Sequence, residues 1–199
     1  MTEKSLQYSN DVDHWAKMLE GDHDAFNILY ERYFPMLFRY ALRFTTNRSI
    51  IKDLLQDLFT ALFLKGRELP PVHNPRSYLL VATRRKVIKK IQQEAKISTE
   101  AIREQEYDFR LELSADNAII NKQSWEQQRY LLEQTLSLLT RRQKEAIYLR
   151  FYEEMSYDEI AEVMSLKEVK YARTLVYRAL TEMREQLRKK NGQHGLMIS

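Results

Sequence analysis

Basic side chains are gathered in two stretches of the chain, where their charge could bind phosphate groups. Residues 74–96 hold seven basic side chains and one acidic side chain, a net charge of +6, and residues 165–190 hold eight basic and three acidic, a net charge of +5. Between them, residues 97–126 carry three basic and seven acidic side chains, a net charge of −4. This pattern predicts a chain that touches a polyanion at two places. On charge alone, two solvated helix faces remain an equal alternative.

The acidic residues Asp53 and Asp57 form a second group whose type and spacing could support binding chemistry. They stand four residues apart and share one face of a helix, an arrangement that suits a divalent metal, but no third ligand lies near them in sequence. The four histidines (14, 23, 73 and 194) are widely separated and the chain has no cysteine. We therefore expect no metal site, no cofactor and no catalytic residue, and we interpret the acidic pair as a solvated or partner-facing patch.

An enzymatic alternative is a helical metal-dependent hydrolase built on Asp22, Asp24, Asp53 and Asp57, but no histidine supports it. Phosphate loops of the glycine-rich kind are excluded because only four glycines occur, at positions 21, 66, 192 and 195. We predict that the protein is not an enzyme.

No apolar run approaches the roughly 18 to 20 residues that a membrane span requires. The first 31 residues hold two basic and seven acidic side chains, unlike the basic start of a signal peptide. We expect a soluble, cytoplasmic protein with no membrane insertion.

The elements that must position these residues are helices. Glycine and proline are absent from residues 76–191, and apolar residues recur at helical spacing almost throughout. The fold class is predicted to be all-α, with N-caps at Asp22, at Asn47 or Ser49, and at Asn74, and with capping boxes at Thr140/Gln143, Ser156/Glu159 and Ser165/Glu168. The helices are expected near residues 12–19, 23–44, 50–65, 75–95, 115–138, 141–152, 157–164 and 169–187.

The apolar pattern breaks from Ile97 to Asp116, where acidic residues dominate. This break predicts two small helical domains joined by an acidic linker. The predicted bounds are a first domain over 1–96, a linker over 97–115, a second domain over 116–192 and a tail over 193–199.

The end of the second domain reads as a helix-turn-helix. Ile160, Ala161 and Met164 give a short helix an apolar face, and a tight turn separates it from a long helix with a basic outer face. The second helix is then expected to enter the major groove of DNA. An ordinary helical hairpin with a basic exterior is the alternative. The long helix is predicted to point Lys170, Tyr171, Thr174, Arg178 and Thr181 away from its apolar stripe.

At this point both halves resemble one family, the bacterial sigma factors of the small, two-domain extracytoplasmic-function (ECF) group within the sigma-70 superfamily. The match covers roughly residues 20–190, and the ordered pair of segments is more specific than either alone. Residues 52–59 (KDLLQDLF) are similar to the helix that binds core polymerase, and residues 77–91 are similar to the stretch that melts and reads the promoter's −10 element. Residues 139–143 (LTRRQ), 149–152 (LRFY), 155–161 (MSYDEIA) and 177–180 (YRAL) resemble the domain that reads the −35 element.

The chain departs from the family pattern in two places. Thr83-Arg84-Arg85 stands where the family usually shows Ala-Arg-Asn, which leaves the −10 preference open. The turn before the last helix, residues 165–168, has no glycine and is one residue longer than usual, so the register of the recognition helix is open by about one residue. By its position in the apolar stripe, Arg84 is expected to snorkel or to pair with a carboxylate.

The resemblance implies a function and a set of site residues. The protein would be a sigma factor that binds the β′ and β subunits of core RNA polymerase and directs transcription initiation at specific promoter DNA. Core polymerase would be bound by Asp53, Gln56, Asp57 and Phe59. The −10 element would be bound by Arg76, Tyr78, Arg85, Lys86 and Lys89, with the loop over residues 66–74 as the pocket for an unstacked base. The −35 element would be bound by Lys167, Lys170, Tyr171, Arg173, Thr174, Leu175 and Arg178, with Arg188 as a further phosphate contact.

Two further expectations concern partners. The family often has an anti-sigma factor, which could clamp both domains, although no residue of this chain identifies one. The main rival is a conventional helix-turn-helix transcriptional regulator with an N-terminal helical sensing or dimerisation domain. That rival explains the second basic segment and leaves the first unexplained.

Overall fold

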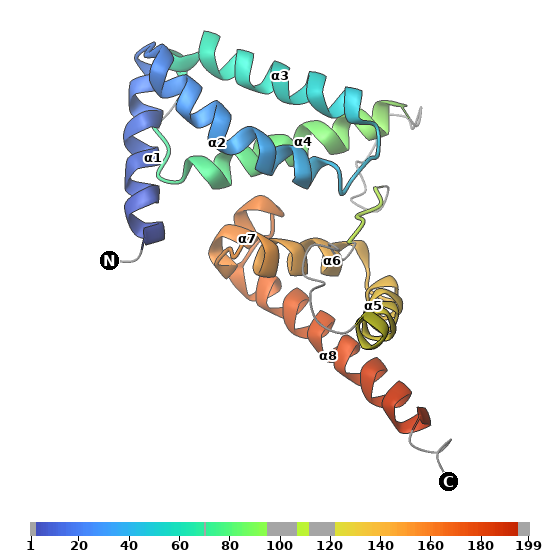
Figure 1. Ribbon diagram of the computed structural model, residues 1–199. Coiled ribbons are helices and arrows are strands. Elements are labelled where there is room, and N and C mark those ends of the chain that lie inside the picture. Colours follow the sequence, from blue (N-terminus) through green and yellow to red (C-terminus); the bar gives the residue numbers. More distant parts are fainter. Residues whose placement is uncertain (1–2, 70, 95–106, 112–121, 195–199) are drawn as a thin grey trace. The chain divides into compact units, whose positions relative to one another are not determined.

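Helices are the regular elements of this protein. The computed structural model describes residues 3–69, 71–94, 107–111 and 122–194, and no strand occurs within those ranges, as the predicted all-α class requires. The chain divides into two units, Met1–Asp108 and Phe109–Ser199, so the division falls inside the predicted linker. Figure 1 shows the helices of each unit.

In its described residues, the first unit contains four α-helices and one short 3₁₀ turn. The expected N-caps explain where several of them begin: the side chain of Asp22 accepts hydrogen bonds from the amides of Asp24 and Ala25, and that of Asn47 accepts one from Ile50. Asn74 accepts from the amide of Ser77, with Pro75 at the first helical position. The elements are α1 (Glu3–Leu19), α2 (His23–Ala41), α3 (Arg48–Leu64), η1 (Gly66–Glu68) and α4 (Pro75–Glu94).

The turn between α1 and α2 needs its glycine. Gly21 has a φ of 97°, in the left-handed region, and its amide donates to the carbonyl of Met18 while the amide of Asp22 donates to that of Lys17. These two bonds make a Schellman motif, in which a left-handed residue closes a helix. The turn returns the chain so that α1 packs along α2.

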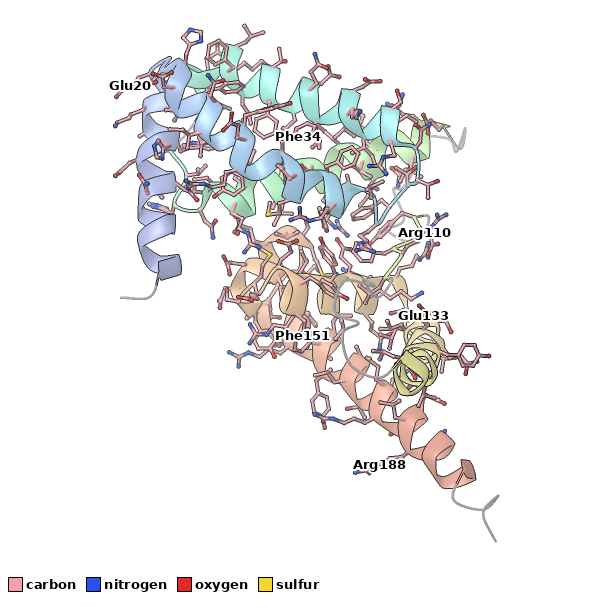
Figure 2. The ribbon with its side chains drawn as sticks, in the orientation of Figure 1. Glu20, Phe34, Arg110, Glu133, Phe151 and Arg188 are labelled. Carbon is pink, nitrogen blue, oxygen red and sulfur yellow. The ribbon has the colours of Figure 1, made fainter. Side chains whose placement is uncertain are left out.

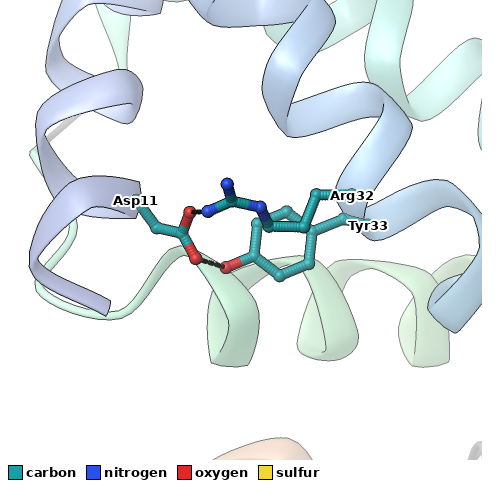
Figure 3. A network of polar contacts seen from close by, with 3 residues as sticks. All are labelled: Asp11, Arg32 and Tyr33. Atoms are coloured by element: carbon teal, nitrogen blue, oxygen red, sulfur yellow. Dashed lines mark hydrogen bonds and ion pairs between the residues drawn. The ribbon is translucent and has the colours of Figure 1, made fainter. Parts of the chain in front are cut away.

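Helix α2 is central in the first unit, because α1, α3 and α4 all pack against it. Leu37, Tyr40 and Ala41 of α2 are fully buried. Asp11 of α1 is also buried, where its carboxylate pairs with Arg32 and accepts a 2.5 Å hydrogen bond from the hydroxyl of Tyr33 (Figure 3). This contact fixes α1 to α2 by charge as well as by apolar packing.

In the second unit the first described helix packs on the last one, and two of the three predicted capping boxes are confirmed. The side chains of Thr140 and Gln143 bond reciprocally to each other's backbone amides, and those of Ser156 and Glu159 do the same. The elements are α5 (Lys122–Ser137), α6 (Arg141–Ile147), the π-helical turn η3 (Tyr148–Tyr152), α7 (Tyr157–Val163) and α8 (Val169–His194). Residues 112–121, which include the expected start of α5 near 115, lie outside the described part of the chain.

The turn between α7 and α8 differs from the expectation for Ser165. Its φ is 52°, its amide donates to the carbonyl of Glu162, and the amide of Leu166 donates to that of Ala161. Ser165 therefore closes α7 in a Schellman motif, and α8 starts four residues later at Val169. The predicted capping box of Ser165 with Glu168 is wrong for this reason. The serine takes the left-handed position where glycine is usual.

Two aromatic residues of the predicted linker are buried, one in each unit. Tyr107 packs in the first unit, with its ring centroid 5.2 Å from that of Phe44. Phe109 is fully buried in the second unit, where its ring lies 5.8 Å from that of Tyr148. Each domain core thus takes one side chain from the segment that the sequence assigned to the linker.

Candidate nucleic-acid interface

The basic face of α4 is formed as predicted. Arg85, Lys86 and Lys89 are exposed, whereas Val87 and Ile88 of the same turns are buried. The apolar positions anchor the helix against the rest of its unit, so the cations between them point to solvent. This face presents exposed positive charge that suits phosphate groups.

Arg84 lies beside this face but is not part of it. Arg84 is only 4% exposed, and one of its guanidinium nitrogens donates a 3.0 Å hydrogen bond to the hydroxyl of Tyr107. The guanidinium carbon also lies 5.6 Å from the centre of the Tyr107 ring, a cation–π contact. Sequence reasoning placed Arg84 in the apolar stripe but missed its tyrosine partner, because the partner comes from the predicted linker.

Arg76 and Tyr78, at the start of α4, are half-buried and already engaged within the protein. The guanidinium of Arg76 donates to the sulfur of Met36 at 3.4 Å. The ring of Tyr78 meets the buried indole of Trp15 edge to face, with centroids 5.2 Å apart. These contacts distinguish the two residues from the exposed cations further along α4, and they orient both side chains.

The acidic face of α3 brings together three of the four predicted polymerase-binding residues. Asp53, Gln56 and Asp57 are all exposed. Phe59 is not on this face, because it is only 3% exposed and packs against the aromatic residues of α2, with its ring 4.9 Å from that of Tyr30. The aromatic stripe of α2, in which Tyr30 is followed by Phe34 (Figure 2), belongs to this packing.

The helix-turn-helix is present in the second unit. Ile160, Val163 and Met164 of the α7 end are buried, and α7 packs on α8. On α8 the buried side is formed by Ala172, Val176 and Ala179. The predicted base-facing residues lie on the outer side of α8: Lys170, Tyr171, Thr174 and Arg178 are exposed, and Leu175 is half-buried.

Several of these α8 side chains make local contacts. The Lys170 ammonium pairs with Glu168 at 2.8 Å and lies 5.3 Å from the Tyr171 ring centre. The hydroxyl of Thr174 donates to the backbone carbonyl of Lys170.

The predicted phosphate-binding residues Lys167 and Arg188 are exposed, and Arg188 lies near the far end of α8 (Figure 2).

The structure adds a pair of arginines at Tyr157 that the sequence did not reveal. The guanidinium carbon of Arg150 lies 5.0 Å from the centre of the Tyr157 ring, and that of Arg173 lies 5.5 Å from it. Arg150 also donates to the carbonyl of Met155, before α7 begins. The predicted phosphate residue Arg173 is thus held against α7, and its position depends on a residue 16 positions away in sequence.

Among the described residues, no group of three or more histidine, aspartate or glutamate side chains could hold a metal ion. Among the helices that the structure describes, none is long and apolar enough to cross a membrane. Exposed charged and aromatic side chains lie on the helices α3, α4 and α8, and such surfaces suit the binding of macromolecules.

Comparison with known families and structures agrees with this arrangement. The model of sigma-70 region 2 matches residues 29–97, which cover α2 from Leu29 onward together with α3 and α4. The model of sigma-70 region 4 matches residues 129–183, which include the helix-turn-helix. Curated protein sequences give no significant match.

Solved structures share the fold. CnrH, solved in complex with the cytosolic domain of CnrY, is 21% identical with a TM-score of 0.58, and the match covers 90% of this chain and 97% of CnrH. The sigma factor RpoE from Bartonella quintana, solved with the anti-sigma factor NepR, is 19% identical with a TM-score of 0.55, and the match covers 82% of this chain and 96% of RpoE. With both sigma-70 regions matched in order, each on the unit where the sequence motifs predicted it, the chain belongs to the sigma-70 family.

Proposed function

We propose that this chain is a sigma factor of the ECF group that recruits core RNA polymerase to promoters, reading the −10 element with its first domain and the −35 element with its second. The observation that supports this most is that each matched region carries an exposed basic helix face, on α4 and on α8, backed by a buried apolar face. A conventional regulator needs only the second of these faces.

In this proposal the acidic face of α3 binds the β′ subunit. Asp53 and Asp57 repel DNA and favour a basic partner, so the face selects protein over promoter. Gln56 between them adds neutral hydrogen-bonding groups. Phe59 is buried below this acidic face and contributes to binding indirectly, because its packing against α2 holds α3 in place. The β subunit is the expected second polymerase partner, through the second domain.

The −10 element is assigned to α4 and the loop before it. Arg85, Lys86 and Lys89 bind phosphates while a strand separates, and an unstacked base needs a pocket or an aromatic surface to enter. Arg76 and Tyr78 stand at the junction of loop and helix, where their contacts with Met36 and Trp15 orient them.

The −35 element is assigned to α8. Lys170, Tyr171, Thr174 and Arg178 face bases in the major groove, and Leu175 contacts a thymine methyl group. Lys167, Arg173 and Arg188 bind phosphates. The Schellman turn at Ser165 sets where α8 begins, and with it which side chains face the bases.

The expected affinities for DNA favour cooperation between the two domains. A few phosphate contacts per domain give dissociation constants of roughly 10⁻⁴ to 10⁻⁶ M. Joining two weak sites on a common platform raises the overall affinity by about 10² to 10⁴. The isolated chain should therefore bind promoter DNA poorly, and the polymerase-bound chain tightly.

We further infer an anti-sigma protein as a regulatory partner, because the two exposed basic faces can bind an acidic protein. Of the solved structures that share the fold, RpoE was solved with the anti-sigma factor NepR, and CnrH was solved with the cytosolic domain of CnrY. A pull-down from native cells should recover it beside polymerase subunits, and recovery of polymerase subunits alone would count against it.

Recruitment is tested by reversing the charge on α3. The double variant Asp53→Lys/Asp57→Lys should lose at least tenfold in affinity for core polymerase, measured by fluorescence anisotropy of the labelled chain. Glu31→Lys, an exposed position on α2, is the matched control and should bind normally. Unchanged affinity of the double variant would refute the assignment of this face.

A further inference from the structure

Arg84 is the one cation of α4 that the protein buries, with 4% of its surface exposed. The other cations of this fully described helix are exposed or half-buried: Arg76, Arg85, Lys86, Lys89 and Lys90. Taking a charge out of water is costly unless the charge is paired or hydrogen-bonded. The residue that covers Arg84 therefore decides whether the basic face of α4 carries its full charge.

The cover is Tyr107, which lies outside the sigma-70 region 2 match because that match ends at residue 97. Tyr107 is 2% exposed, and both its hydroxyl and its ring contact the Arg84 guanidinium. Its ring also packs on Phe44, just beyond the end of α2. Tyr107 is thus docked on the first unit partly through Arg84 and partly through an aromatic contact that does not involve Arg84.

A phosphate group is a stronger partner for a guanidinium than a tyrosine hydroxyl is. The hydroxyl is neutral and accepts one hydrogen bond from Arg84, at 3.0 Å, whereas a phosphate is charged and accepts two parallel bonds from an arginine. Charge-assisted bonds are roughly twice as strong as neutral ones. A nucleic-acid strand on the exposed cations Arg85 and Lys86 therefore brings a competing acceptor close to Arg84.

We propose that Tyr107 is a removable cover and that Arg84, once uncovered, becomes a further phosphate-binding residue of α4. The inference rests on the proposed function, which assigns α4 to the −10 element. Successive residues lie about 100° apart around a helix, so the long Arg84 side chain can turn from Tyr107 towards the side of Arg85. Docking of Tyr107 and binding of a phosphate by Arg84 then exclude each other.

This competition lowers the affinity of the isolated chain for DNA. Apparent affinity falls with the fraction of molecules that are competent to bind, and here the competent molecules are those in which Arg84 is uncovered. A partner that holds the segment Tyr107–Leu111 away from α4 would raise the affinity without touching DNA itself.

The test removes only the hydroxyl of the cover. Tyr107→Phe keeps the ring against Phe44 but lacks the acceptor, and loss of one neutral hydrogen bond shifts Arg84 towards release by about 2- to 10-fold. Binding of the full chain to a short fluorescein-labelled oligothymidylate is measured by anisotropy at several salt concentrations. The variant should bind about 2- to 10-fold more tightly. Its plot of log affinity against log salt should steepen by up to about 0.7, the value for one more phosphate of a single strand.

A double variant shows whether the gain comes from Arg84. Tyr107→Phe/Arg84→Met replaces both partners by apolar groups of similar shape, a change that costs little stability, and it should bind as the natural chain does. Tyr130→Phe is the matched control, since it removes the hydroxyl of a 64% exposed tyrosine on α5, and it should also bind normally. Unchanged affinity for Tyr107→Phe, or a gain that persists in the double variant, would overturn the inference.

Arg85→Gln separates this inference from the proposed function. Arg85 is exposed on the same helix, so its loss should make the salt plot about 0.7 less steep, with or without Tyr107→Phe. If Arg85→Gln changes nothing, α4 binds no strand, and the assignment of the −10 element to α4 fails. If Arg85→Gln weakens binding while Tyr107→Phe has no effect, only the inference about Arg84 fails.

Discussion

At the scale of single residues, buried polar contacts hold the recognition surfaces in place. Asp11 is 2% exposed and binds Arg32 and Tyr33 of α2, and Trp15 one turn later packs on Tyr78. The carboxylate therefore helps to position a residue of the proposed −10 surface, although it touches no DNA itself.

Removing this carboxylate should destabilise the first domain. Asp11→Ala leaves Arg32 and Tyr33 without their shared acceptor and should lower the unfolding free energy by about 3 kcal/mol, at the lower end for buried pairs because Arg32 is 30% exposed. Tyr33→Phe loses one hydrogen bond to a charged group and should cost about 2 kcal/mol. Urea unfolding followed by Trp15 fluorescence in a Trp125→Phe background measures both. Asp13→Ala, an exposed neighbour, should change little, and an equal effect there would contradict the assignment.

The helix cap at Asp22 should make stability depend on pH. The amide of Ala25 is the main cause that lowers the pKa of Asp22 below its ordinary value of 3.8, aided by the amide of Asp24 and opposed by desolvation. The ionised form thus stabilises the fold above the ordinary pKa, and this contribution disappears as pH falls through the lowered folded-state value. Asp22→Asn keeps a capping side chain that does not titrate. The difference in Tm between the two proteins should narrow from pH 6 towards pH 2, and a constant difference would exclude the cap as its source.

At the scale of elements, the turn between α7 and α8 carries a measurable strain. Ser165 occupies the left-handed region, which costs an L-residue roughly 1–2 kcal/mol, while glycine costs about 0.5–1 kcal/mol in chain entropy. Ser165→Gly should therefore raise the unfolding free energy by about 0.5–1 kcal/mol. Binding to −35 DNA should not weaken, since the backbone is unchanged. Loss of stability, read by thermal unfolding, would show that the serine side chain makes a contact that outweighs the strain.

Helix boundaries were largely predictable from sequence because they depend on local chemistry. The caps at Asp22, Asn47 and Asn74 and two capping boxes all act within three residues. The basic face of α4 and the outer face of α8 followed from helical periodicity in the same way. The third predicted capping box is wrong because Ser165 takes the left-handed position that ends α7, a role that local sequence assigns to glycine rather than to serine.

Contacts between distant segments could not be predicted. Tyr107 binds Arg84 across 23 residues and Trp15 binds Tyr78 across 63, and no local pattern encodes either pair. Phe59 was misplaced for a related reason: motif similarity placed it near an exposed acidic face, whereas the rings of α2 bury it. Aromatic residues within the acidic stretch, at 107 and 109, were the available signal that this stretch is more than a linker.

At the scale of the whole molecule, the central claim is that the chain gives core polymerase a promoter choice that neither has alone. Run-off transcription from a random DNA library, with purified core polymerase in the presence and absence of the chain, tests it most directly. Transcripts are expected only when both the chain and core polymerase are present, and they should start downstream of a shared two-part element. The central claim would be contradicted if no transcripts formed and the chain alone bound specific DNA as tightly as the polymerase-bound chain does. That result would identify a conventional regulator instead.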